Sequence, residues 1–369
     1  MRIKQKLLSE VSEVPALFER NYFPSLDGLR AVSILLVVVI HVLMSFSLKF
    51  DFHPLANLGV QFFFVISGFL ITTLLLKEKV TKGSISLKNF YIRRFYRIIP
   101  LAYFYLLAVC ALNILLGLNI SWYAILFSFL FVRNFFLNYK GANHLTSHYW
   151  SLAIEEQFYL IFPFILKRNL NIYMFFLAFI ICFSLLFDLL HIHTSNPYVG
   201  FVFNLIVQFQ GIAVGSLCSV LIFKKVIVFN GGGRYKSLLV SGLFLLTFLS
   251  PLILKSSQHL MIFIESVSFS ALLILCLIRE NAGDPIFDFL NHKIMKGVGM
   301  LSYSLYIWQQ PLTLNLGYFN RAGFLAGFPY KFITYTSISI VSLGLLALVG
   351  YLSYFHFEKR FLKLKYKYQ

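Results

Sequence analysis

Charged residues are scarce in this chain, at 12% of the total, where soluble domains carry roughly 25%. That shortage excludes an ordinary soluble domain. Cysteine is also sparse, with four residues in apolar stretches and no paired spacing, so neither a disulfide framework nor a zinc site is predicted. The signatures of nucleophile-elbow hydrolases (G-x-S-x-G), zinc peptidases (H-E-x-x-H) and Walker A nucleotide-binding loops are absent from the sequence.

Apolar residues make up most of the chain. The chain of 369 residues is 59% hydrophobic and 18% aromatic, with a mean hydropathy of +0.78. Stretches of about 20 apolar residues, the length of a helix that crosses a bilayer, recur along it. We therefore expect an all-α integral membrane protein, a single domain over 1–369 with no appended soluble domain. Ten spans are predicted, around 28–47, 57–76, 98–117, 149–166, 173–190, 202–223, 237–254, 260–279, 299–318 and 332–355.

The basic residues set the expected orientation. Lysine and arginine outnumber acidic residues by 32 to 14 and cluster between the spans, and short basic loops stay cytoplasmic. Ten spans place every cluster on the cytoplasmic side, together with both termini. An eleventh crossing at 121–138 would reverse the later clusters, so this segment is predicted to be re-entrant or interfacial. The net charge of +18 indicates contact with anionic lipid headgroups rather than with nucleic acid.

Two ionisable side chains, Arg30 and His41, flank an apolar run in the first span. Eleven helical residues make three turns plus about 20°, so both should project from one face, about 16 Å apart. Charge at such depth is costly and usually faces a bundle interior or a watery cavity. Either Arg30 reaches the interface and His41 is a packing residue, or the pair lines a passage in which His41 is a general base.

A basic stretch, FYIRRFYRIIP, opens the third span with Arg93, Arg94 and Arg97 on adjacent faces of about one turn. Guanidinium groups suit phosphate oxygens, so a nucleotide-bearing donor such as an acyl-CoA is one ligand for them. The alternative is an ordinary basic flank of a membrane helix.

The fourth span begins HYWSLAIEEQF and carries two adjacent carboxylates, Glu155 and Glu156. A carboxylate can orient an imidazole so that its other nitrogen accepts a proton. For Glu155 this role competes with a structural ion pair, and for Glu156, which points about 100° away, the structural role is favoured.

Three further stretches need explanation. Small residues in 59–76 and in 211–215 predict closely packed helices. The stretch LSYSLYIWQQPL brings the polar tips of Tyr303, Tyr306, Trp308 and Gln310 into a span, which a membrane-interface aromatic belt explains in large part.

Taken in order, these stretches resemble the acyltransferase-3 family of membrane acyltransferases over nearly the whole chain. The resemblance rests on SLDGLRAVSILLVVVIH, FFFVISGFLI, RRFYRIIP, YWSLAIEEQFYLIFP, SYSLYIWQQP and FEKRF. It implies a ten-helix enzyme of the bacterial inner membrane that transfers an acyl group, acetyl by default, from cytoplasmic acyl-CoA to a hydroxyl of a cell-surface or exported saccharide, such as an O-antigen of lipopolysaccharide or an exopolysaccharide. Acyl-CoA would be the donor substrate, with no bound cofactor and no metal.

The resemblance also implies roles for individual residues. His41 matches the essential histidine, Arg30 its motif partner and Glu155 an acidic position. The donor would meet Arg93, Arg94 and Arg97. The residues expected at the acceptor or along the pore are Asp27, Trp150, Ser151, Tyr306, Trp308 and Gln310. Gln309 stands where many relatives have histidine, which leaves open whether this last motif takes part in the chemistry.

Two other readings remain open at this point. In a transporter or flippase, Arg30, His41 and Glu155 would form a proton or substrate path, although the sequence lacks the internal repeats common in transporters. A membrane acyltransferase acting on lipid or protein is the other. Dependence on acyl-CoA separates the transporter from both enzymes.

Overall fold

The structure is a computed structural model that describes residues 2–19, 22–45, 53–136, 144–189, 203, 205–227, 235–253, 258–278, 285–313 and 331–368. Throughout these residues the regular structure is helical and no β-strand is present. The predicted helical class is therefore confirmed for the part of the chain that the structure describes.

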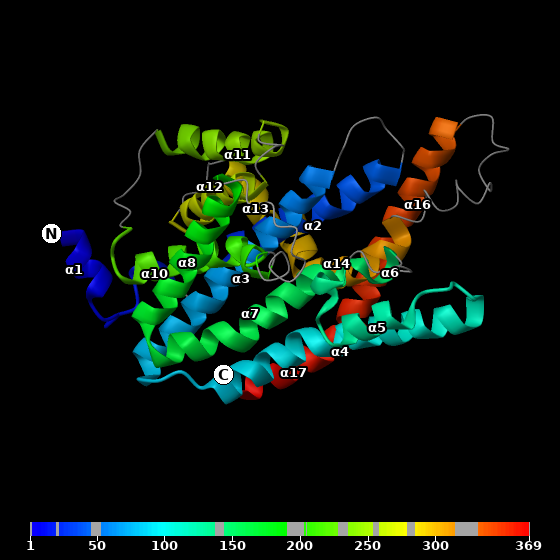
Figure 1. Cartoon of the computed structure of the whole chain (residues 1–369). Coiled ribbons are helices and arrows are strands. Elements are labelled where there is room, and N and C mark those ends of the chain that lie inside the picture. Colours follow the sequence, from blue (N-terminus) through cyan, green and yellow to red (C-terminus); the bar gives the residue numbers. More distant parts are fainter. Residues whose placement is uncertain are drawn as a thin grey trace. The chain divides into compact units, whose positions relative to one another are not determined.

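The helices follow the predicted apolar stretches. In chain order they are α1 (Arg2–Leu8), α2 (Pro24–Ser45), α3 (His53–Lys82), α4 (Leu87–Leu116), α5 (Trp122–Phe129), α6 (His144–Ser147), α7 (Tyr149–Arg168), α8 (Leu170–Leu189), α10 (Gln210–Phe223), α11 (Tyr235–Ile253), α12 (Gln258–Ile278), α13 (Pro285–Asn291), α14 (Lys293–Thr313), α16 (Lys331–Leu352) and α17 (Lys359–Lys365) (Figure 1). Short 3₁₀ segments are η1 (Ala16–Phe18), η2 (Arg133–Phe135) and η4 (Tyr366–Tyr368). A π-helical segment, η3 (Ser353–Glu358), joins α16 to α17.

Six stretches among the described residues are long and apolar enough to cross a membrane. They are Pro24–Met44, Asn57–Lys82, Leu87–Leu116, Leu170–Phe187, Gln258–Leu277 and Thr336–Lys365. The other four predicted spans are helical as α7, α10, α11 and α14, but they are shorter or more polar than that criterion allows. The fold is therefore helical with six candidate membrane spans, and the ten-span topology stays a prediction.

The predicted start of α4 and the predicted span 202–223 differ most from the structure. Helix α4 starts eleven residues before the predicted span because the Ser86 side chain caps it, accepting a hydrogen bond from the backbone N–H of Asn89 at 3.4 Å. It ends at Gly117, whose φ of 58° lies in the left-handed region that glycine adopts readily. The predicted span 202–223 is helical but interrupted: residues 203 and 205–207 are helical, a turn at Gln208 and Phe209 follows, and α10 begins at Gln210.

The segment predicted to be re-entrant or interfacial does not form a long helix. Its described part, up to Phe136, consists of the eight-residue α5 and the 3₁₀ turn η2. Eight helical residues extend only about 12 Å, well under half of the hydrocarbon thickness. The described residues therefore agree with the prediction that 121–138 does not cross as an eleventh span.

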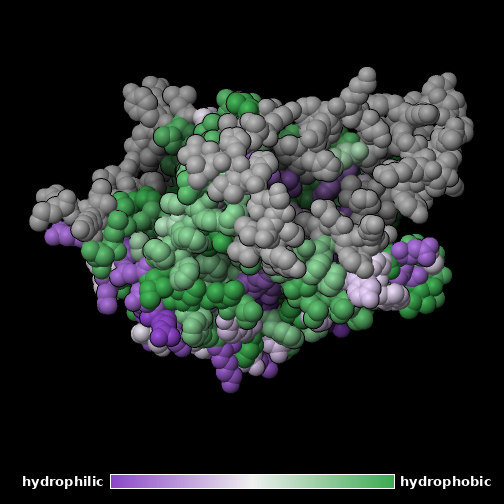
Figure 2. Space-filling view, viewed as in Figure 1, coloured by the Kyte–Doolittle hydropathy of each residue, from purple (hydrophilic) through white to green (hydrophobic). Residues whose placement is uncertain are grey.

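Large apolar side chains are exposed along several helices, among them Leu115, Leu160, Phe175 and Ile340. Figure 2 shows apolar residues over much of the described surface on the face viewed. Contiguous exposed apolar surface of this extent is rare in soluble monomers. Contact with lipid tails accounts for it, in agreement with a multi-pass membrane protein.

The chain divides into two compact units, each described here by itself. Unit 1 comprises Met1–Ser33, Asn57–Ile85 and Gln157–Gly299, and contains most of α3 together with α8, α10, α11 and α12. In unit 1, α11 lies beside α12 (Figure 1). Unit 2 comprises Ile34–Ala56, Ser86–Glu156 and Met300–Gln369, and in it α17 lies along α4.

Glycines bring α3 and α10 together in unit 1. A Cβ atom at Gly215 would lie 2.2 Å from the backbone oxygen of Val65, and one at Gly68 would lie 2.1 Å from that of Ile212. Both glycines come from the small-residue stretches noted in the sequence. The prediction that these stretches serve helix packing is confirmed, because any larger residue would meet the backbone of the other helix.

Candidate active site

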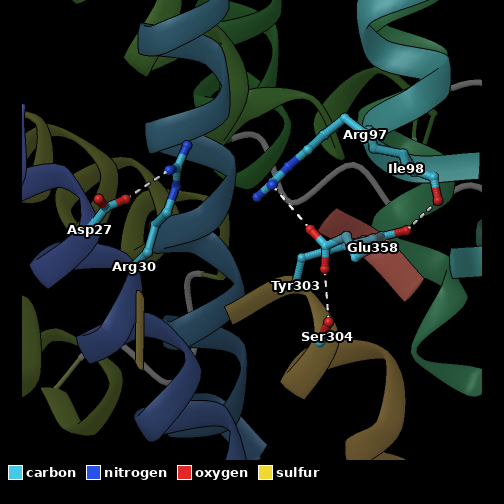
Figure 3. Close-up of polar contacts among 7 residues, drawn as sticks. All are labelled: Asp27, Arg30, Arg97, Ile98, Tyr303, Ser304 and Glu358. Atoms are coloured by element: carbon cyan, nitrogen blue, oxygen red, sulfur yellow. Dashed lines mark hydrogen bonds and ion pairs between the residues drawn. The ribbon is translucent and has the colours of Figure 1, made fainter. Parts of the chain in front are cut away.

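Arg30 and His41 both belong to α2, as predicted. Arg30 lies in unit 1, where its Nη1 pairs with Oδ1 of Asp27, one turn earlier, at 3.2 Å (Figure 3). The hydroxyl of Tyr22 donates to the other carboxylate oxygen at 2.8 Å. Asp27, expected at the acceptor or pore, is therefore the local partner of Arg30.

His41 lies in unit 2 and is held by an amide. Its Nδ1 is 2.9 Å from Oε1 of Gln309, which α14 buries completely. An amide oxygen accepts hydrogen bonds, so this contact favours the tautomer with the hydrogen on Nδ1 and the lone pair on Nε2. This is the tautomer that a general base needs. The position that departs from the family pattern therefore contacts the predicted base directly.

The beginning of α7 is fastened to α14 through Tyr306. The Tyr306 hydroxyl lies 2.5 Å from the hydroxyl of Ser151 and donates to the backbone oxygen of His148 at 3.2 Å. The Ser151 hydroxyl donates to the same backbone oxygen at 3.2 Å. Two residues expected at the acceptor, Ser151 and Tyr306, are thus brought together on buried surfaces of the two helices.

The remaining acceptor candidates have different surroundings. Trp308 donates from Nε1 to the hydroxyl of Ser353 at 3.1 Å, and its ring meets that of Tyr105 edge to face. Trp150 is half-buried near the start of α7. Gln310 is buried, and its Oε1 meets no hydrogen-bond donor among the described residues. Trp308 therefore joins α14 to η3, whereas Gln310 keeps an unused acceptor.

Arg97 has a carboxylate partner that the sequence motifs did not reveal. Its Nη1 lies 3.1 Å from Oε1 of Glu358, and Oε2 of Glu358 accepts from the Ser304 hydroxyl at 2.8 Å (Figure 3). Glu358 is 2% exposed. Beside this pair, Tyr303 donates to the backbone oxygen of Ile98 at 2.6 Å. One carboxylate therefore ties α4, α14 and η3 together.

The other two arginines of the basic stretch differ from Arg97. Arg93 donates from Nη1 to the backbone oxygen of Tyr368 at 2.8 Å. Arg94 lies over the ring of Phe90, 5.8 Å from its centroid, and near enough to Glu156 to stabilise its charge. Glu155, the other carboxylate acting on Glu156, lies on the same turn of α7. Arg94 therefore lies within electrostatic reach of Glu156, whereas Arg97 pairs with Glu358.

The π-helical segment explains how two contacts fall on one face of α14. Ser304 and Trp308 are four residues apart on α14, and their partners Glu358 and Ser353 are five apart. In an α-helix, five residues turn by about 500°, which separates the side chains by about 140°. The i to i+5 bonding of a π-helix brings residues five apart to nearly one face. The wide turn therefore lets both partners reach α14.

Polar residues with no role predicted from the sequence have partners that are far away along the chain. Glu358 lies in the FEKRF stretch, which supports only the family resemblance, and Gln309 is the position that departs from the family pattern. His148 has no role predicted from the sequence, although it stands two residues before Trp150. No group of three or more histidine, cysteine or acidic residues that could hold a metal ion occurs in the ranges described.

Comparisons with known proteins agree over most of the chain. The family model of acyltransferase 3, described as an acyltransferase domain, matches residues 23–355. The chain is 28% identical over 382 residues to the O-acetyltransferase OatA of Staphylococcus aureus (strain NCTC 8325 / PS 47), covering 95% of this chain and 59% of that protein. It is 37% identical over 158 residues to the peptidoglycan O-acetyltransferase OatA of Listeria monocytogenes, covering 40% of this chain and 24% of that protein. The chain spans about half the length of the curated relatives it matches. No solved structure matches it.

Proposed function

Because the chain belongs to the acyltransferase 3 family, we propose that it is a multi-pass membrane O-acetyltransferase that transfers an acetyl group from acetyl-CoA to a hydroxyl of a cell-surface saccharide. The peptidoglycan named for the Listeria relative favours a cell-envelope glycan as acceptor. The donor reaches the enzyme from the cytoplasm, and the acceptor lies on the outer side of a bacterial inner membrane. Both termini are cytoplasmic in this arrangement.

The contact between His41 and Gln309 supports this proposal most directly. A saccharide hydroxyl has a pKa far above 7, so it attacks a thioester only if a base takes its proton as the new bond forms. Oε1 of Gln309 lies 2.9 Å from Nδ1 of His41, a contact that favours the tautomer with the lone pair on Nε2. A carboxylate is not needed for that purpose, because an amide oxygen accepts the same hydrogen.

The transfer balances with His41 as proton carrier. The hydroxyl oxygen bonds to the thioester carbon, its proton passes to Nε2 of His41, and the carbon–sulfur bond breaks. The proton then passes from His41 to the departing thiolate, which leaves as the free thiol of CoA. His41 could instead carry the acetyl group as a covalent intermediate before the hydroxyl attacks; rapid-quench trapping of labelled enzyme distinguishes the two routes.

The other residues have supporting roles in this proposal. Arg94 contacts the donor phosphates, with Arg93 and Arg97 on the same turn. Arg30, paired with Asp27 on α2, and Glu155 on α7 are the further charged residues assigned to the catalytic reaction. Trp150, Ser151, Tyr306, Trp308 and Gln310 form the acceptor side.

The test is transfer of radiolabelled acetyl from acetyl-CoA to envelope glycan in membranes containing matched amounts of each variant. Wild type should label the glycan. His41→Ala should lose the transfer by about 100-fold or more, since it removes the general base. Arg94→Ala should raise the KM for acetyl-CoA and recover at high donor concentration, since it removes binding rather than chemistry.

The control is His259→Ala, which removes a half-buried imidazole of unit 1 and should leave the rate unchanged. Equal labelling by wild type and His41→Ala would contradict the proposed role of His41. Absence of any acetyl-CoA-dependent labelling would favour the transporter or flippase instead.

A further inference from the structure

His148 is a buried imidazole whose hydrogen-bonding capacity is unused. It lies between α6 and α7 in unit 2 and is 2% exposed. Among the described residues, neither Nδ1 nor Nε2 has a partner with the distance and angle of a hydrogen bond, and the backbone group that acts on the ring is that of Ile307. Buried polar groups are almost always bonded, so an orphaned imidazole calls for a specific explanation.

The tyrosine hydroxyls around His148 form hydrogen bonds with other groups. Its ring is enclosed edge-on by Tyr105, Tyr149 and Tyr306, at centroid distances of 5.3, 4.9 and 5.7 Å. The hydroxyl of Tyr105 donates to the backbone oxygen of Leu145 and that of Tyr149 to Ala102. The Tyr306 hydroxyl is bonded to Ser151 and to the backbone oxygen of His148 itself. Three aromatic rings thus enclose the imidazole, and none of their hydroxyls bonds to its nitrogens.

Helix α14 brings His148 and His41 into one neighbourhood. Tyr306 and Gln309 are three residues apart and so share a face of α14. From that face Tyr306 bonds the backbone of His148, and Gln309 bonds the ring of His41. His41 lies near enough to affect the charge of His148. One helix face therefore positions both imidazoles.

The two imidazoles are suited to different tasks. Burial, with a smaller contribution from His41, lowers the pKa of His148 to about 3 against a small opposing effect of the Ile307 backbone. Its ring is thus neutral at physiological pH and is a poor base, but one ring nitrogen still carries a hydrogen to donate. A fixed neutral donor is what stabilises negative charge that develops on an oxygen during acyl transfer.

We propose that the ring N–H of His148 donates a hydrogen bond to the carbonyl oxygen of the acetyl thioester as it becomes an oxyanion. This proposal rests on the proposed function. As the hydroxyl oxygen bonds to the carbonyl carbon, the carbonyl electron pair moves to the oxygen that His148 holds, and His41 takes the hydroxyl proton. The electron pair returns as the carbon–sulfur bond breaks, and His41 protonates the leaving sulfur.

The experiment compares His148→Phe, which keeps a buried ring without a donor, with His148→Gln, which restores an N–H donor. Both are assayed with radiolabelled acetyl-CoA and envelope membranes, alongside wild type. His148→Phe should lower kcat by about 100-fold to 1,000-fold, the usual loss for one oxyanion donor, while the KM for acetyl-CoA changes by less than about twofold. His148→Gln should recover at least about tenfold of that loss.

A melting curve and a gel-filtration profile in detergent separate chemistry from folding. A ring that only packs should tolerate phenylalanine, because an apolar ring removes an unsatisfied buried polar group. Unchanged kcat in His148→Phe with active wild type would therefore overturn this inference alone. Equal loss in the phenylalanine and glutamine variants would also overturn it. Inactive wild type would overturn the proposed function and, with it, this inference. His259→Phe in unit 1 is the matched control and should retain the wild-type rate.

Discussion

Helices are joined by opposite means in two regions of this molecule. In unit 2, α4 meets η3 and α14 through the buried ion pair of Arg97 and Glu358, to which Ser304 adds a hydrogen bond. In unit 1, α3 meets α10 through glycines, with backbone against backbone and no charge. The first joint depends on chemical identity at a few positions, and the second depends on the absence of side chains.

The ion pair of Arg30 and Asp27 does not connect two helices. Its nitrogen–oxygen distance of 3.2 Å is close to the 3.1 Å of Arg97 and Glu358, but both partners lie on one turn of α2 and are partly exposed. An (i, i+3) pair stabilises its own helix modestly. The three sites therefore rank by the stability that a substitution should cost. The cost is largest where a buried charge loses its partner, smaller where an added side chain overlaps a backbone, and smallest where the remaining charge is partly hydrated.

Breaking the Arg97–Glu358 joint should have the largest effect. Glu358→Ala leaves a partly buried guanidinium without its carboxylate, which should cost about 3 kcal/mol or more of stability. The melting temperature in detergent and the fraction of monodisperse protein measure this. Glu358→Gln, which keeps an acceptor for Ser304, should lose less. A Glu358→Ala variant as stable as wild type would show that the pair does not join these helices.

Overfilling the glycine joint should come second. Gly215→Ala places a Cβ about where the backbone oxygen of Val65 lies, so α3 and α10 must separate, at a cost of about 1–3 kcal/mol. Gly242→Ala in α11 is the matched control, because its Cβ would meet no atom within 4 Å. The control should be neutral or slightly stabilising. If both variants melt alike, the close approach of α3 and α10 is not maintained.

Removing the local pair should matter least. Asp27→Asn keeps the size of the side chain and an acceptor for Tyr22 while it removes the negative charge, so a loss under about 1 kcal/mol is expected. The same melting assay applies, with Asp288→Asn in α13, an exposed acidic residue, as reference. A loss as large as that of Glu358→Ala would mean that Asp27 has a partner beyond its own helix turn.

Hydropathy predicted the positions of the helices better than their boundaries. Hydropathy located ten helical stretches because apolar surface must meet lipid or core wherever it occurs in the chain. It did not reveal the turn at Gln208 within 202–223 or the early start of α4, because a turn and a cap such as that at Ser86 depend on hydrogen bonds rather than on hydropathy. The close packing at Gly215 was predictable because small-residue spacing is a local signal.

The site was predictable only where its signals are local. Single residues such as His41 and Arg97 stand out against apolar surroundings, so they could be selected from the sequence. Their partners could not, because Gln309 is 268 residues from His41 and Glu358 is 261 from Arg97. Nor does any sequence pattern state that the nitrogens of His148 lack partners, since that depends on where three tyrosine hydroxyls point.

The wide turn at Ser353–Glu358 has a consequence for how this region tolerates changes in length. It accommodates one residue more than an α-helix would between the contacts to Trp308 and Ser304. Deleting one residue there would turn the segment into a regular α-helix. Ser353 and Glu358 would then be four residues apart, the same spacing as Trp308 and Ser304 on α14. Adding one residue would rotate every later side chain by about 100°. This segment should therefore tolerate the deletion of one residue without losing its contacts to α14, but not the insertion of one.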